Sequence, residues 1–285
     1  MNGEPSPPLS AKDSGIQSIS RASAVLDAVA ECSRTGARLN DVTKATELNR
    51  ATVHRILNAL VRTGLLERAE QEPLYFVGIR VMALAAASAR RFGLAERYAG
   101  ACARIAARSG DTVFLQALSG RESVCLSRTE GSFPIKALTL ELGERRPLGI
   151  GAGGLAILAS LDEAERQSVL NADAGRHRDF NITRAQIEDG VHRTRTDGYA
   201  LDANTVIQGI TGVSVPLNGK APEAIGALTV AAISDRLQGA HLASVIEDLG
   251  NEVARIGLEP PAFDLPAPSS RRADATGGRL AVTRR

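Results

Sequence analysis

The chain has 285 residues, enough for two domains with separate hydrophobic cores. Its net charge of +2 averages two unlike parts: residues 14–91 hold eleven Lys/Arg against seven Asp/Glu, and residues 92–262 hold seventeen against twenty-one. We therefore expect only the basic front to approach a polyanion. Three separated cysteines argue against a zinc or disulfide framework, and no stretch has the pattern of a signal peptide or membrane span. The sequence predicts a cytoplasmic protein without a membrane partner.

Both ends of the chain are rich in Pro, Ser, Gly and charge, and we expect residues 1–13 and 263–285 to be disordered. The first ordered element is an amphipathic helix over residues 16–32, with apolar positions at Ile19, Val25 and Val29 among others.

Residues 39–64 are predicted to form two short helices that meet at a tight turn. Asn40 and Asn49 are the expected N-caps, and Gly64 is expected to end the second helix. In the first helix the residues predicted to face inward are Val42, Ala45 and Leu48. The second helix carries an apolar stripe at the spacing of one helical face, formed by Val53, Ile56, Leu57, Leu60 and Val61.

The rest of the second helix carries hydrogen-bonding side chains, and a short helix of this kind suits the major groove of DNA. The candidate DNA-binding residues are Arg50, Ala51, Thr52, His54, Arg55 and Asn58. Two plainer alternatives stay open: these side chains only solvate a surface helix, or His54 packs against the linker or a partner subunit.

Two short strands, 65–68 and 74–77, flank a polar turn and are typical of a wing. Residues 14–78 are therefore predicted to be a winged helix-turn-helix domain. Glu70 and Glu72 make the tip of the wing acidic, which weakens any case for strong wing contact with DNA. Residues 79–93 follow as an Ala-rich linker helix without an internal Gly or Pro.

Residues 94–262 alternate between strand and helix patterns and predict a second, α+β domain around an antiparallel sheet. Strands are expected at 112–119, 123–129, 134–142, 198–201, 212–217 and 225–233. Helices are expected at 155–159, 162–170, 183–197 and 237–256, the third beginning at a capping box formed by Thr183 and Gln186.

A glycine-rich stretch, residues 147–154, precedes one of these helices. Glycines allow close approach of a ligand, a helix N-terminus favours anions, and Arg145 and Arg146 add positive charge, so a small carboxylate is a natural guest. The stretch also matches a dinucleotide fingerprint through Gly149, Gly151 and Gly154, with Asp173 downstream. A third interpretation is that the glycines serve only tight packing.

Five motifs in one order resemble the IclR family of bacterial transcriptional regulators over residues 16–258. They are ISRASAVLDAVAE, ATVHRILNALVRTGLLER, RRPLGIGAGGLAILA, TRTDGYALDANTVIQGITGVSVPL and IGALTVAAIS. The resemblance implies a winged helix, a linker helix and a GAF-like, profilin-like effector-binding domain. It also implies assembly as a homodimer or a dimer of dimers.

The resemblance places the contacts to a small acid on Gly151, Ala152, Asp202, Gly212, Thr229 and Ala231. Gly212 and Ala231 stand where members that bind tiny oxoacids have polar side chains, so a larger, partly apolar or aromatic acid is expected here. Asp202 would bond a ligand hydroxyl or cap a turn. Thr229 would face the ligand or serve as an ordinary strand residue.

These features predict a ligand-responsive transcriptional regulator that binds a double-stranded DNA operator and a small carboxylate effector, with no cofactor and no metal. The alternatives are an architectural DNA-binding protein without an effector and, less favoured, a small-molecule enzyme. The four histidines show no metal spacing, no GxSxG elbow occurs, and Cys125 is better interpreted as a buried structural thiol than as a nucleophile.

Overall fold

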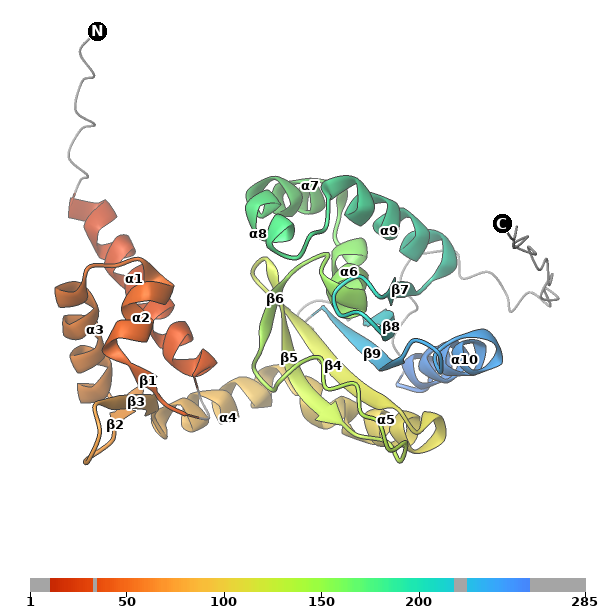
Figure 1. Ribbon diagram of the computed structural model, residues 1–285, viewed down its shortest axis with the longest axis horizontal. Helices are drawn as coiled ribbons and strands as arrows, with labels where there is room; N and C mark the ends of the chain where they lie inside the picture. The colour runs from red at the N-terminus through yellow and green to blue at the C-terminus, as the bar shows by residue number, and fades with distance from the viewer. Residues whose placement is uncertain (1–10, 33–34, 218–224, 257–285) are drawn as a thin grey trace, which may run out of the picture. The chain divides into compact units, whose positions relative to one another are not determined.

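The computed structural model describes residues 11–32, 35–217 and 225–256 (Figure 1). These residues divide into two compact units, one ending at Gly93 and the other beginning at Leu94. Residues 11–13, which we expected to be disordered, are instead the first residues of helix α1. The other expected disordered positions, 1–10 and 263–285, lie outside the described residues.

The N-terminal unit is a winged helix-turn-helix, as predicted. Its elements are α1 (Ala11–Glu31), β1 (Ala37–Arg38), α2 (Leu39–Thr46), α3 (Arg50–Arg62), β2 (Leu66–Arg68) and β3 (Leu74–Val77). The wing strands β2 and β3 pair antiparallel. No sequence pattern indicated β1, which adds a third strand on the free side of β3.

One hydrophobic core holds the three helices and the wing together. The predicted stripe of α3 supplies Val53, Leu57 and Leu60 as buried residues, while Ile56 and Val61 pack at its edge. Val25 and Val29 of α1 and Val42 of α2 complete the centre. The predicted inward position of Ala45 was wrong, because Ala45 is exposed on α2. Ile19, an apolar position of the first helix, is also exposed.

Of the two predicted N-caps, one is confirmed and one is wrong. Asn49 caps α3, its side-chain oxygen accepting the Thr52 N–H at 2.8 Å. Asn40 is not a cap: α2 already begins at Leu39, and Arg38 is its N-cap. The reason is β1, whose pairing with β3 carries the chain directly from strand to helix.

The linker helix α4 (Arg80–Phe92) begins in contact with the end of the recognition helix. Arg80 Nη1 donates to the Thr63 carbonyl at 2.6 Å, and Gly78 N donates to the Leu65 carbonyl at 2.9 Å. A Cβ at Gly78 would overlap the carbonyl of Gly64. The end of α3, the wing and the start of α4 are therefore packed as one piece.

The C-terminal unit is built on a six-stranded antiparallel sheet, as predicted. Its spatial order is β6-β5-β4-β9-β8-β7. The strands are β4 (Thr112–Ser119), β5 (Glu122–Thr129), β6 (Arg145–Pro147), β7 (Ala200–Ala203), β8 (Ile210–Leu217) and β9 (Gly226–Ile233). Together with the winged helix, this sheet confirms the α+β fold class.

Helices cover both faces of this sheet (Figure 1). One face packs against α5 (Leu94–Ser109) and α10 (Gly239–Arg255). The other lies under α6 (Gly151–Ser160) and α9 (Arg184–Asp197), with α7 (Glu163–Ala172) and α8 (Ala174–Asp179) beyond them. The alternation of β9 follows this division: Leu228 and Val230 belong to the core under α5 and α10, whereas Thr229 and Ala231 face the other way.

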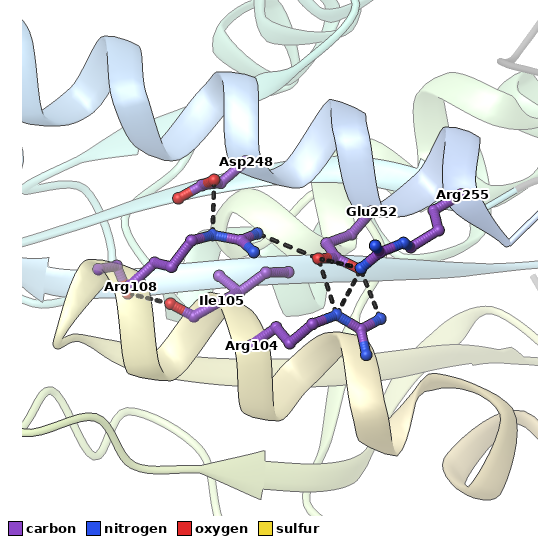
Figure 2. A network of polar contacts seen from close by, with 7 residues as sticks. Arg104, Ile105, Arg108, Asp248, Glu252 and Arg255 are labelled. Atoms are coloured by element: carbon purple, nitrogen blue, oxygen red, sulfur yellow. Dashed lines mark hydrogen bonds and ion pairs between the residues drawn. The ribbon is translucent and has the colours of Figure 1, made fainter.

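A network of charged side chains joins α5 to α10 (Figure 2). The Glu252 side chain is only 3% exposed and pairs with Arg104 at 2.6 Å and Arg108 at 3.1 Å. Arg108 also reaches Asp248 at 2.8 Å. The bonds from Arg104 lower the pKa of Glu252, so this carboxylate stays ionised at neutral pH.

The strand expected at 134–142 was predicted wrongly. This segment is an irregular loop, and the edge strand that pairs with β5 is β6, nearer to the glycine-rich stretch. Side chains satisfy carbonyls of this segment that a neighbouring strand would otherwise bond: Arg146 donates to Thr139, and Arg128 Nη1 donates to Leu140 at 3.3 Å. Only Ala137 and Leu140 of the loop are buried.

Candidate functional site

The candidate DNA-binding residues lie on the first two and a half turns of α3. His54 and Arg55 are exposed, and Asn58 is half-buried with its amide nitrogen 3.3 Å from His54 Nε2. His54 therefore does not pack against the linker within this unit. Arg55 has no partner among the described residues, so its five N–H donors are available to a ligand.

The other candidates at the start of α3 are positioned by neighbouring side chains. Arg50 donates to Asn40 Oδ1 of α2, which ties the two helices of the motif together. Thr52 is half-buried beside its cap, and Ala51 is exposed. At the wing, the acidic tip is partly neutralised because Glu72 lies 3.8 Å from Arg38 of β1.

In the C-terminal unit, all six candidate effector-binding residues line one cavity. Including its mouth, the cavity has a volume of about 470 Å³. It lies between the sheet, the start of α6 and the turn after β7. The sheet register explains part of the convergence: Asp202 is paired with Gly212, and Gly212 with Ala231. Thr229 lies two residues before Ala231 on the same face of β9.

The floor of the cavity is a buried polar network. Thr229 Oγ1 lies 3.1 Å from Gln116 Oε1 and 2.9 Å from Ser214 Oγ, and Gln116 Nε2 donates to Ser123 Oγ at 3.2 Å. All four residues are buried. Ser214 Oγ donates to the Leu228 carbonyl at 3.0 Å, so the single Thr229 hydroxyl proton can bond either Gln116 Oε1 or Ser214 Oγ.

Glycines of the stretch 147–154 have two roles: they allow α6 to pack closely on the sheet, and they leave space for a ligand. A Cβ at Gly153 would overlap Gln116 Oε1, and one at Gly212 would lie 3.3 Å from the Ala152 methyl, so both glycines let α6 lie close to the sheet. The Ala152 methyl thus takes up part of the space above Gly212, although Gly212 still lines the cavity. Gly151 differs: its φ is +69°, and a Cβ there would meet only Val206 at 3.9 Å.

Arg146 also lines the cavity, and its guanidinium is held in place by the protein. Its Nε and Nη2 donate to Glu144 Oε1 at 3.1 and 2.9 Å, and Nη2 donates to the Thr139 carbonyl as well. Nη1 has no partner among the described residues. The first amide groups of α6 lack intrahelical acceptors, and Ile150 at the N-cap supplies no side-chain cap.

Asp202 has two roles in the structure. Thr205 and the backbone N–H of Val206 lie close enough to its carboxylate to favour the charged form, at the turn after β7. It also forms part of the cavity wall. Burial raises the pKa of Asp202, and the hydrogen bonds to Thr205 only partly oppose this effect.

Sequence reasoning missed most of the apolar walls of the cavity. They are formed by Phe114, Leu140, Ile150, Val206, Ile207 and Ile210. Leu140 belongs to the segment expected to be a strand, and Phe114 carries no motif beyond strand alternation. Following the period of two along β4 would have placed Phe114 on the same face as Gln116.

The dinucleotide interpretation of the glycine-rich stretch is wrong. That site needs a parallel strand–helix–strand unit, and every strand pair of this sheet is antiparallel. Asp173, which would have bound the ribose, is buried and paired with Arg121 at 3.2 Å.

The described residues show no cluster of His, Cys, Asp and Glu able to hold a metal ion. Burial raises the pKa of the Cys125 thiol to about 11, which disfavours the thiolate that a nucleophile requires. None of the described helices combines the length and apolar character needed to cross a bilayer.

A winged helix-turn-helix followed by a linker helix and a cavity-bearing domain is the architecture of a DNA-binding transcriptional regulator. Residues 18–70 match the IclR helix-turn-helix domain, and residues 86–257 match the bacterial transcriptional regulator IclR C-terminal domain. The chain therefore belongs to the IclR family of transcriptional regulators.

Alignments with related regulators cover most of this chain and most of each relative. The chain is 31% identical over 259 residues to the regulator BhcR of Paracoccus denitrificans, covering 88% of this chain and 91% of BhcR. It is 28% identical over 238 residues to XynR of Escherichia coli, covering 82% and 93%. A solved IclR-type regulator from Silicibacter sp. TM1040 superposes with a TM-score of 0.74 at 25% identity, covering 86% of this chain and 98% of that one.

A further solved structure is an IclR homologue from Microbacterium hydrocarbonoxydans complexed with 4-hydroxybenzoate. It superposes with a TM-score of 0.66 at 22% identity, and covers 84% of this chain and 97% of that one. At this identity the likeness supports the shared fold.

Proposed function

We propose that this regulator senses a small carboxylic acid with an aromatic or otherwise apolar body, and that binding of this acid changes its affinity for an operator. The observation that carries the proposal is the convergence of the six candidate residues and Arg146 on one cavity.

The carboxylate of the effector is assigned to the end of the cavity that holds Arg146 and the start of α6. Arg146 is preoriented by Glu144 and Thr139, and its Nη1 group is available for a charge-assisted hydrogen bond. The amide groups of Gly151 and Ala152 add donors at the positive end of the helix.

The body of the effector is assigned to the apolar walls. Phe114, Leu140 and Ile210 offer aromatic and aliphatic contacts, and Ala231 adds no polar group. A two-carbon oxoacid would leave these walls uncovered, whereas an aromatic acid would bury them. The 4-hydroxybenzoate bound to the Microbacterium hydrocarbonoxydans homologue is an acid of this type.

On the DNA side, we propose that Arg50, Thr52, His54, Arg55 and Asn58 contact the operator, with Ala51 against the groove. One recognition helix covers only a half-site, so we expect a homodimer or a dimer of dimers on a two-fold symmetric operator. Effector binding is transmitted through the chain connection that α4 makes between the two units.

Ligand screening tests the effector. Full-length protein is titrated with benzoate, 4-hydroxybenzoate, pyruvate and glyoxylate, and melting temperature and calorimetric affinity are measured. We expect the aromatic acids to bind more tightly, and Arg146→Ala to weaken them at least tenfold while Arg145→Ala, whose side chain pairs with Glu122 at 2.6 Å, changes them less. Tighter binding of glyoxylate would contradict the proposed acid, and no binding by any of them would favour the architectural alternative.

An operator titration tests the DNA contacts. Arg55→Ala should weaken binding to the protein's own promoter by about ten- to a hundredfold without changing the melting temperature. Arg178→Ala, an exposed arginine of α8, is the matched control for charge and should have little effect. Unchanged affinity in Arg55→Ala would show that this side chain does not contact the operator.

A further inference from the structure

A buried hydroxyl group without a hydrogen-bond partner lies at the start of β4. It belongs to Thr112, a residue that is only 1% exposed. Within the described ranges of the chain, Ser127 is the one other residue with a buried side-chain oxygen or nitrogen in this condition. Buried polar groups are nearly always paired, because an unpaired group has given up its bonds to water without replacing them. The Thr112 hydroxyl is therefore free to bind a polar group of a ligand.

The register of the sheet places Thr112 next to the cavity lined by the six candidate effector-binding residues, which we call the effector cavity. Val113 belongs to the core under α5 and α10, so its neighbours Thr112 and Phe114 point to the opposite face of β4. Thr112 is paired with Ala231 of β9, and Phe114 with Thr229. These two pairs form a block of four adjacent side chains on one face. Three of the four line the effector cavity, and Thr112 is the fourth.

Ala231 is the point of the cavity wall that lies beside Thr112. The Cβ atoms of directly paired residues are about 4.5–5.5 Å apart. Ala231 ends at its Cβ, whereas Thr112 continues with two γ atoms, so the Thr112 side chain stands higher than the Ala231 methyl group. The two γ atoms are of similar size, and a turn about χ1 between staggered positions aims the hydroxyl over Ala231 without enlarging the side chain. A ligand group that rests on the Ala231 methyl then lies beside this hydroxyl.

The surroundings of Thr112 determine which kind of group it would bind. Phe114 and Ala231 belong to an apolar cluster that also holds Ala137 and Leu140, and no member of this cluster is charged. A second carboxylate on the ligand would find no cation there and would be costly to bury. A hydroxyl group carries one donor and accepts as well, so it can pair with the Thr112 hydroxyl in either direction.

We propose that the effector carries a hydroxyl group on its apolar body, away from the carboxylate, and that Thr112 binds this hydroxyl. The inference rests on the proposed function, because it takes the carboxylate to lie beside Arg146. Thr112 then distinguishes a hydroxylated acid from the same acid without the hydroxyl group.

Calorimetry with benzoate, 3-hydroxybenzoate and 4-hydroxybenzoate tests the inference on full-length protein. Thr112→Val removes the hydroxyl at nearly constant volume, Thr112→Ala is a second variant without it, and Thr112→Ser keeps it. Ser127→Ala is the matched control: Ser127 is paired with Leu115 of the core under α5 and α10, so this variant removes a buried hydroxyl from the other face of the sheet. Melting temperatures accompany the titrations, and we expect Thr112→Val to melt no lower than wild type because it removes an unpaired polar group.

We expect wild-type protein to bind at least one hydroxybenzoate about fivefold or more tightly than benzoate. Loss of this preference in Thr112→Val and Thr112→Ala, with benzoate affinity of Thr112→Val within about twofold of wild type, supports the role of Thr112, as does a preference kept in Thr112→Ser and Ser127→Ala. Equal binding of the three acids by wild type, or a preference kept in Thr112→Val, overturns the inference and leaves the proposed function intact. If none of the three acids binds wild type, the aromatic-acid proposal fails and the inference falls with it.

Discussion

Single residues around the effector cavity are under competing demands. Asp202 lies at a turn, lines the effector cavity and is half-buried, so its charge is costly although its hydrogen bonds favour it. Thr229 is a strand residue by pattern but belongs to a buried network that reaches Gln116. These positions contribute to structure and to binding at once, so neither role excludes the other.

The charge of Asp202 has a predictable effect on stability. Because its folded pKa is raised above the ordinary 3.8, its ionisation costs folding free energy once the pH exceeds that value. Asp202→Asn should therefore raise the melting temperature near pH 7, keep an oxygen acceptor for Thr205, and match wild type below about pH 3.8. Melts followed by circular dichroism check this, with exposed Asp235→Asn as control. A lower melting temperature of Asp202→Asn at pH 7 would mean that the capping role outweighs the burial of charge.

Gly153 gives a second test at this scale. Since a Cβ would overlap Gln116 Oε1 beneath α6, Gly153→Ala should destabilise the C-terminal unit by about 1–3 kcal/mol, although alanine favours helices. Urea unfolding measures the change. Gly250→Ala, in α10 with open space around it, should be neutral or stabilising. Equal stability of Gly153→Ala and wild type would show that α6 has room to move away from the sheet.

Among the elements, helix packing is secured by charge as well as by apolar contact. α10 lies against α5 along an apolar core that includes Cys102, Ile105 and Leu249. Glu252 adds a buried carboxylate bonded by Arg104 and Arg108 (Figure 2). Removing one partner from such a group is more harmful than its presence is helpful.

Glu252→Gln should therefore lower the free energy of unfolding at pH 7 by about 1–3 kcal/mol. The folded pKa of Glu252 is lowered, so its stabilisation is present above about pH 4.5 and is lost as the pH falls through the folded pKa. The gap between variant and wild type should shrink below pH 4.5. Urea titrations at several pH values measure it, with exposed Glu247→Gln as control. If the difference in free energy of unfolding between variant and wild type stayed constant below pH 4.5, the stabilisation by Glu252 would not come from its charge.

Many of the helices and strands could be predicted from the sequence. Strand β4 (residues 112–119), the capping box of α9 and the stripe of α3 depend on local periodicity and capping, which neighbouring residues determine. The failures depend on distant partners. Strand β1 is paired with β3, and the carbonyls of Thr139 and Leu140 in the loop 134–142 accept hydrogen bonds from Arg146 and Arg128 instead of from a strand. The cavity walls likewise come from separate segments, so Phe114 and Ile210 could not be grouped beforehand.

At the scale of the whole molecule, the winged helix-turn-helix and the cavity-bearing domain have separate hydrophobic cores. The candidate DNA-binding residues lie on α3 above the core around Val53 and Leu57, and the cavity lies beside the cores around Phe114 and Leu158. Each unit therefore has its own hydrophobic core. The chain between them runs through α4 and Gly93, whose φ is +51°.

Operator binding and effector binding should respond differently to salt. A dimer that contacts about six to ten phosphates would lose roughly 10³- to 10⁵-fold in operator affinity between 50 and 200 mM salt. The proposed effector would be held by one cation, Arg146, and by apolar walls, so its affinity should fall much less over the same range. Fluorescence anisotropy for DNA and calorimetry for the acid measure the two. An operator affinity insensitive to salt would argue against the arginine-rich face of α3 as the contact surface.

The joint between α3, the wing and α4 has a consequence for how such regulators diversify. Arg80 and Gly78 fasten the linker to α3, so all of the proposed operator contacts lie before Gly93, in one unit. After gene duplication, substitutions in the cavity wall could change which effector is bound, while the copy keeps its operator. A biosensor can be engineered in the same way, by altering residues such as Phe114 and leaving the reporter gene and its promoter untouched.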